Sequence, residues 1–92
     1  MAKAQQTPAY VQNVLAGHAE IEGNPQLRAR IQEVREALRP IGSIHGIERG
    51  GRPEEDGSVS HRRYRILGNS GSRLCLVQIT NEGNIAWIEL LP

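Results

Sequence analysis

The hydrophobic pattern of this chain switches from a helical period to a period of two near Pro40, and this switch limits the chain to few folds. Before Pro40, apolar residues recur at intervals of four, three and four, as on one face of an amphipathic helix: Leu27, Ile31, Val34 and Leu38. After Pro40, apolar and polar residues alternate in segments separated by glycines, as in half-buried strands. Helices followed by strands predict an α+β domain.

Two helices are predicted in residues 7–39, each from a capping residue followed by proline. Thr7-Pro8 and Asn24-Pro25 place a hydrogen-bond acceptor directly before a proline suited to the first helical position. The first helix is expected to end near Gly17 and to carry on one face Val11, Val14, Leu15 and His18. The second ends at Arg39, because the residue before a proline is disfavoured in helical geometry. Residues 1–6 are expected to form a flexible tail.

Four strands are predicted in residues 43–91, joined as an antiparallel meander. They are expected near Ser43–Arg49, Val59–Leu67, Arg73–Thr80 and Ile85–Leu91. Segment 50–57, GGRPEEDG, is expected to be a polar, flexible loop. The 92 residues then form a single domain, with two N-terminal helices packed on one face of a four-stranded antiparallel sheet.

The stretch GNSGS (68–72) has the composition of a phosphate-binding loop, but we predict a hairpin turn. A phosphate-binding loop delivers backbone amides to the anion at the start of a helix. The residues after Ser72 alternate as a strand, so no helix begins there. In a hairpin, Gly71 can supply a positive φ at the turn.

A register follows if both hairpins close with two-residue loops, Ser70-Gly71 and Glu82-Gly83. The face toward the helices is then apolar and carries Tyr64, Ile66, Cys75, Val77, Ile79, Ala86, Ile88 and Leu90. The opposite face carries Arg63, Arg65, Leu67, Leu74, Leu76, Gln78, Ile85, Trp87, Glu89 and Leu91. In this register one row across the sheet contains Arg65, Leu76 and Glu89. The next row contains Arg63, Gln78 and Trp87.

This opposite face is the candidate binding surface. A solvated sheet face is mostly polar, whereas this one combines apolar and charged residues, namely Trp87, Leu76, Leu74, Arg63, Arg65 and Glu89. An apolar centre with an aromatic anchor and arginines is typical of protein interfaces. The expected occupant is a second copy of the chain, with Arg65 and Glu89 exchanging partners across a two-fold axis, or a different protein. Alternatively, Trp87 is half-buried under loop 50–57 or the N-terminal tail.

Other functional classes fit the sequence less well. A net charge of +1 argues against nucleic-acid binding, and the HRRYR segment (61–65) aligns only three basic groups on one side of a strand. The lone Cys75 excludes an internal disulfide and a multi-cysteine zinc site, and the three histidines lack metal-ligand spacing. We therefore predict a non-enzymatic binding module without metal or cofactor. The alternative is a small enzyme or ligand-binding domain with a pocket between helices and sheet that uses His18 and Tyr64.

Two short motifs lie in the last third of the chain, Tyr-x-Ile-x-Gly-x-x-Gly and Trp-Ile-x-Leu-Leu. Their positions are Tyr64, Ile66, Gly68, Gly71, Trp87, Ile88, Leu90 and Leu91. With the Asn-Pro helix start, they resemble the small α+β domain of cytochrome-oxidase assembly factors, which implies a non-enzymatic assembly role behind a membrane anchor. The order of helices and sheet also resembles cystatin-like and nuclear-transport-factor-like domains. No apolar run is long enough for a membrane span, so we expect a soluble, cytoplasmic protein or the soluble domain of an anchored one.

Overall fold

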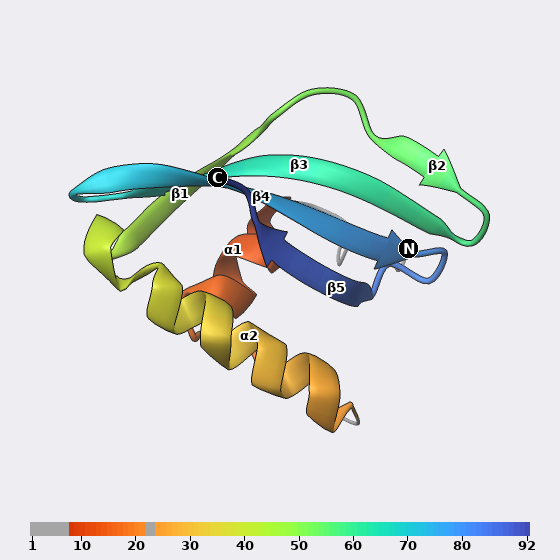
Figure 1. The fold of residues 1–92 in the computed structure, drawn as a ribbon, viewed down its shortest axis with the longest axis horizontal. Helices are drawn as coiled ribbons and strands as arrows, with labels where there is room; N and C mark the ends of the chain where they lie inside the picture. Colours follow the sequence, from red (N-terminus) through yellow and green to blue (C-terminus); the bar gives the residue numbers. More distant parts are fainter. Residues whose placement is uncertain (1–7, 22–23) are drawn as a thin grey trace.

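Two helices lie under one face of an antiparallel sheet (Figure 1). The computed structural model describes residues 8–21 and 24–92. Its helices are α1 (Pro8–Leu15), α2 (Pro25–Ala37) and the short 3-10 helix η2 (Arg39–Ile41). Its strands are β1 (Ile44–Arg49), β2 (Glu54–Asp56), β3 (Val59–Gly68), β4 (Gly71–Thr80) and β5 (Ile85–Leu90). The predicted α+β class is confirmed.

Helix α2 begins where the sequence predicts. Oδ1 of Asn24 accepts a hydrogen bond from the backbone amide of Leu27 at 3.0 Å, and proline occupies the first turn. The predicted apolar face is buried in the core and consists of Leu27, Ile31, Val34 and Leu38. The helix ends before Pro40, and the chain tightens into η2.

Helix α1 ends in a glycine cap. Gly17 has a φ of 86° and donates its amide to the carbonyl of Val14 at 3.2 Å, while the amide of His18 donates to Asn13 at 2.8 Å. This pair of bonds is the Schellman arrangement, in which glycine adopts the left-handed conformation that ends a helix. His18 therefore lies past the helix end and is exposed, and does not share the helix face of Val11, Val14 and Leu15 as predicted. The predicted cap Thr7 and the tail 1–6 lie outside the described residues.

Strand β3 is long enough to pair with two strands along one edge. Its C-terminal part pairs with β1 and its N-terminal part with β2, while β4 pairs along its other edge. Segment 50–57, predicted to be a loop throughout, thus contains a strand, and the sheet has five strands in place of four. Gly57, with a φ of 66°, opens the two-residue loop that folds β2 back onto β3.

The β3–β4 hairpin turns at Asn69-Ser70, one residue earlier than predicted. Tyr64 consequently pairs with Cys75 and not with Val77. Because the pairing moves by two residues, an even number, every side chain keeps its predicted face. Gly71 belongs to β4 and pairs with Gly68, so it is not the turn residue.

The start of this hairpin packs against η2. The amide of Ser70 donates to the carbonyl of Ile41 at 2.7 Å, and the amide of Asn69 donates to Ser43 at 3.1 Å. Gly68 lies so close to the carbonyl of Ile41 that there is no room for a side chain. GNSGS is therefore a hairpin turn, as predicted, and these turn amides are used within the chain.

The β4–β5 hairpin contains a bulge that moves Ile85 into the core. Val77 pairs with Ile88 as predicted, but Ile79 pairs with Ile85 in place of Ala86. A one-residue shift changes the face to which a side chain points. Ile85, predicted on the outer face, is buried for this reason.

The core lies between the helices and the inner face of the sheet. The chain has no phenylalanine, and the core consists of aliphatic side chains, one thiol and one tyrosine. Its members on the sheet are Tyr64, Ile66, Cys75, Val77, Ile79, Ile85 and Ile88. Helix α1 packs mainly against β1 and helix α2 against β5, so both helices cover the same face.

Candidate interaction surface

The face of the sheet opposite the helices carries the six predicted site residues. We call it the outer face and define it by the alternate positions of the strands that lie opposite the core positions, namely Glu48, His61, Arg63, Arg65, Leu67, Leu74, Leu76, Gln78, Trp87 and Glu89. Trp87 belongs to this face by register, but it also packs partly against the core. In Figure 1 it is the upper side of the sheet, and the helices lie below. The sheet thus brings residues of β1, β3, β4 and β5 onto one surface.

The rows across the outer face differ from the predicted rows. Arg63, and not Arg65, shares a row with Leu76 and Glu89, because Arg63 pairs with Leu76 and Leu76 pairs with Glu89. Arg65 lies one row away, between Glu48 and Leu74. The displaced β3–β4 turn causes both changes.

The next row contains His61, Gln78 and Trp87, and it continues into β2 with Glu54, which pairs with His61. The prediction placed Arg63 in this row. His61 also lies near the last residue of β2, with its Nε2 3.8 Å from Oδ2 of Asp56. In this row, Gln78 on β4 therefore separates the imidazole of His61 on β3 from Trp87 on β5.

The centre of the outer face is apolar and partly open to solvent. Leu74 is 36% exposed, and Leu67 and Leu76 are half-buried. All three lie on the neighbouring strands β3 and β4. A partner surface placed here would remove apolar area from water, which is the main favourable contribution to association.

The charged residues around this centre are exposed. Within residues 8–21 and 24–92, no ion pair includes Arg63, Arg65 or Glu89. Arg63 and Glu89 lie on opposite sides of Leu76, separated by the width of β4. The row therefore reads cation, apolar residue, anion.

Trp87 lies at the border of the outer face and not at its centre. Strand β5 is the last strand of the sheet, and the guanidinium carbon of Arg30 lies 5.6 Å from the centroid of the Trp87 ring. Nε of Arg30 also donates to the carbonyl oxygen of Ile88 at 2.9 Å. Trp87 is half-buried by a residue of α2, whereas loop 50–57 contains β2 and belongs to the opposite edge of the sheet.

The groups required for the enzyme alternative are not brought together. Tyr64 is 1% exposed in the core, while His18 is exposed beyond the end of α1. Burial raises the pKa of the Cys75 thiol to about 12, so the reactive thiolate is scarce at neutral pH. Among the described residues, no three histidine, cysteine, aspartate or glutamate side chains are grouped to hold a metal ion.

The HRRYR segment divides as predicted. His61, Arg63 and Arg65 belong to the outer face, while Arg62 and Tyr64 alternate to the other side. Nε of Arg62 donates to the hydroxyl of Ser60 at 3.2 Å. The segment thus supplies two arginines to the outer face, Arg65 between Glu48 of β1 and Leu74 of β4, and Arg63 beside Leu76.

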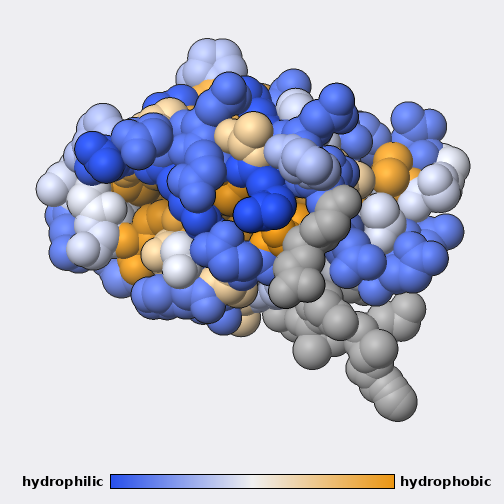
Figure 2. All heavy atoms as spheres, turned by 90° about the horizontal axis from the view of Figure 1, so that it is seen from below, coloured by the Kyte–Doolittle hydropathy of each residue, from blue (hydrophilic) through white to orange (hydrophobic). Residues whose placement is uncertain are grey.

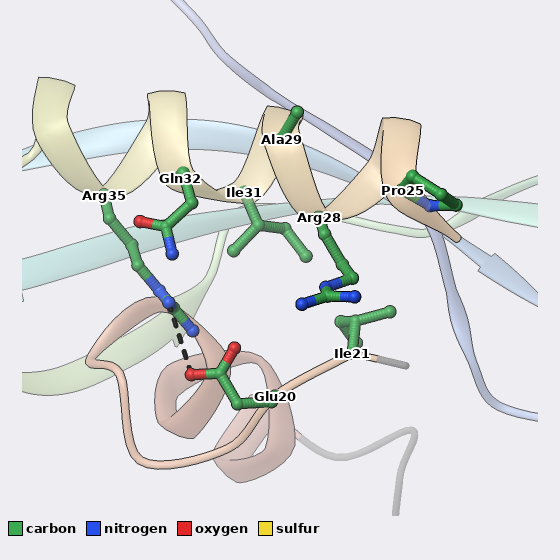
Figure 3. Close-up of a pocket in the computed structure, with 8 residues that line it drawn as sticks. All are labelled: Glu20, Ile21, Pro25, Arg28, Ala29, Ile31, Gln32 and Arg35. Atoms are coloured by element: carbon green, nitrogen blue, oxygen red, sulfur yellow. Dashed lines mark hydrogen bonds and ion pairs between the residues drawn. The ribbon is translucent and has the colours of Figure 1, made fainter. Parts of the chain in front are cut away.

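A hollow on the helical side was not predicted. Seen from below, the molecule has apolar surface in recesses between polar side chains (Figure 2). One recess of about 290 Å³ lies between α2 and the segment around Glu20, and Arg28 and Arg35 point toward that segment (Figure 3). Arg35 is engaged there by backbone carbonyls and by Glu20. The basic residues of α2 looked solvated in the sequence, so their period gave no sign of this recess.

Comparison with protein-family models, curated proteins and solved structures finds no match for this chain. The resemblance to cytochrome-oxidase assembly factors is therefore carried by the motif residues alone. Of the helices that the structure describes, none has the length and apolar character needed to cross a membrane.

Proposed function

We propose that this chain is a non-enzymatic binding module that docks a protein on its outer face. The observation that carries the proposal is the row formed by Arg63, Leu76 and Glu89, in which an apolar residue lies between two exposed, opposite charges. Interfaces combine an apolar centre with a charged rim, and the charges fix the orientation of the partner.

The row also specifies the chemistry of the partner. A matching surface has an apolar centre opposite Leu76, an acidic group opposite Arg63 and a basic group opposite Glu89. Leu74, 36% exposed, extends the apolar contact to the next row. A binding role is also favoured because the tyrosine and histidine of the enzyme alternative lie in the core and at a helix end.

A photo-reactive side chain at position 76 tests this proposal in the cells that produce the protein. We expect a cross-linked product from position 76 and none from position 26, a matched control because Gln26 is exposed on α2. The captured protein is then purified and titrated with the chain. Leu74→Asp should weaken its binding by about tenfold or more, because it places a charge in an apolar contact.

Equal cross-linking from both positions, or none from position 76, would contradict the proposal. So would a captured protein that binds Leu74→Asp as tightly as the original chain. Unchanged thermal unfolding of Leu74→Asp, expected for an exposed side chain, excludes loss of the fold as the cause.

A further inference from the structure

We infer that the partner is a second copy of the same chain, related by a two-fold axis that runs parallel to β4 over Leu76. The inference rests on the proposed function and names the occupant of the outer face. It is carried by the order of side chains across the sheet, with Arg63 on β3, Leu76 on β4 and Glu89 on β5.

This axis makes the row complementary to itself. A half-turn about an axis parallel to β4 leaves β4 above β4 and places β3 of one copy above β5 of the other. Each row is preserved, since positions along the axis do not change. Leu76 then meets Leu76, and Arg63 meets Glu89 of the second copy on both sides of the axis.

The perpendicular axis is excluded by the same charges. A half-turn about an axis that runs along the row would place each residue of that row, Arg63, Leu76 and Glu89, above its own copy. Arg63 would face Arg63, and Glu89 would face Glu89. Like charges placed opposite each other disfavour association, so the charge pattern selects the axis that follows the strands.

The neighbouring rows fit the same arrangement. In the row of His61, Gln78 and Trp87, the axis places His61 of one copy over Trp87 of the other. Gln78 meets Gln78, and an amide can both donate to and accept from its equivalent. On the other side of the central row, Leu74 meets Leu74 and adds apolar contact.

The twist of the sheets does not disturb the central contacts. Packed sheets cross at about 30°, and neighbouring strands lie about 4.8 Å apart. Arg63 and Glu89, which each lie one strand away from the axis, are therefore displaced by about 2.5 Å from the positions directly opposite each other that untwisted sheets would give them. Arginine and glutamate side chains are flexible enough to close this gap.

The size of the face sets the expected affinity. Four strands about 4.8 Å apart and four rows about 6.8 Å apart, from His61 to Leu67 on β3, span roughly 19 by 27 Å. This is small beside the roughly 800 Å² that each partner buries in a standard interface. We therefore expect a weak dimer with a dissociation constant in the micromolar range or above.

Charge reversal with mixing tests the inference on the purified chain. Arg63→Glu alone and Glu89→Arg alone should each weaken dimerisation by about tenfold or more, because each creates two like-charge contacts. A mixture of the two variants should form a heterodimer at least as tight as the original dimer. In that heterodimer Glu at position 63 meets Arg at position 89, and Glu89 meets Arg63.

Sedimentation velocity up to about 1 mM covers the expected affinities. The control pair is Arg52→Glu and Glu82→Arg, which makes the same changes in net charge at exposed positions outside the outer face. The controls should dimerise like the original chain, alone and mixed. Thermal unfolding verifies each variant, and Arg63→Gln with Glu89→Gln replaces any reversal that unfolds, with a weaker dimer expected from each.

A chain that stays monomeric up to this concentration overturns the inference, as does a mixture that fails to restore association. A control pair that behaves like the test pair overturns it too, because net charge would then be the cause. If the chain is monomeric while position 76 cross-links to a different protein, the proposed function stands without the second copy. If position 76 gives no specific product, the proposed function fails.

Discussion

The guanidinium group of Arg35 donates twice to the carbonyl oxygen of Val14, from Nε at 2.9 Å and from Nη2 at 2.7 Å. Nη2 also donates to the carbonyl of Ala19 at 3.1 Å, and Nη1 pairs with Glu20 at 3.5 Å. Val14 lies in the last turn of α1, where carbonyl groups lack regular helical partners. One side chain of α2 therefore caps α1 and orders the segment that follows it.

Arg35→Lys should lower the free energy of unfolding by about 1–2 kcal/mol, because a single ammonium group cannot reproduce the two parallel hydrogen bonds to the carbonyl of Val14. Urea unfolding measures the change. Arg39→Lys is the matched control, since its ion pair with Glu36 at 3.3 Å is exposed and should contribute less than about 1 kcal/mol. Equal losses at the two positions would contradict the capping role.

Gly68→Ala should destabilise the fold by about 2–3 kcal/mol, because the added methyl group would overlap the carbonyl of Ile41. Differential scanning calorimetry measures the loss as a lower unfolding temperature. Gly46→Ala is the control: its methyl group would lie 3.3 Å from the end of the Leu67 side chain, which can move. We expect a loss below about 1 kcal/mol there, and an equally large loss would argue against this role for Gly68.

The stability of the chain should fall at alkaline pH because of Cys75. Burial raises the pKa of this thiol from 9.0 to about 12, and a backbone hydrogen bond with Tyr64 partly opposes the shift. The folded state thus holds the proton more tightly than the unfolded state. The thiol's contribution is complete below about pH 9 and is lost as the pH rises from there toward 12, by at most about 1.4 kcal/mol per unit.

Urea unfolding across this alkaline range, on the original chain and on Cys75→Ala, isolates the effect. The variant is less stable at neutral pH because it leaves a small cavity. Its free energy of unfolding should nevertheless fall less steeply with pH, since other titrating groups are common to both proteins. Parallel curves would show that the thiol does not contribute.

Arg30→Gln should expose Trp87 and shift its fluorescence emission to longer wavelength. The guanidinium carbon lies 5.6 Å from the centroid of the ring, and the arginine also bonds to Ile88. We expect a stability loss of about 1 kcal/mol from these two contacts. Arg28→Gln on the same helix is the control, and it should leave the emission unchanged. Identical spectra for the two variants would contradict the stacking.

The sequence was sufficient to predict the two layers and the faces of β3 and β4. Both depend on the alternation of side chains, which is unchanged when the β3–β4 pairing moves by two residues. The partner of Arg63 depends on the exact pairing, and the β3–β4 turn that accompanies this pairing packs on η2, where Gly68 lies against Ile41. A contact between residues so far apart in sequence leaves no periodic signal.

Three features could not be predicted from the hydrophobic pattern: strand β2, the β4–β5 bulge and the contact of Arg30 with Trp87. Strand β2 is acidic and exposed, so it has no apolar alternation, although the Asp56-Gly57 step is a hairpin signal. The bulge that buries Ile85 depends on the longer β4–β5 turn. The contact of Arg30 with Trp87 was missed because helical period alone placed this arginine on the solvated flank.

The bond from Arg30 to Ile88 also occupies part of one edge of the sheet. An exposed edge strand is a template on which strands of other molecules add without limit. On β5 a carbonyl oxygen that such a strand would use is already occupied, and the stacked tryptophan holds the arginine in place. Growth into fibres is therefore hindered at this edge. By contrast, a sheet face that pairs about a two-fold axis is fully covered by one partner, so this mode of association ends at a dimer and does not form a polymer.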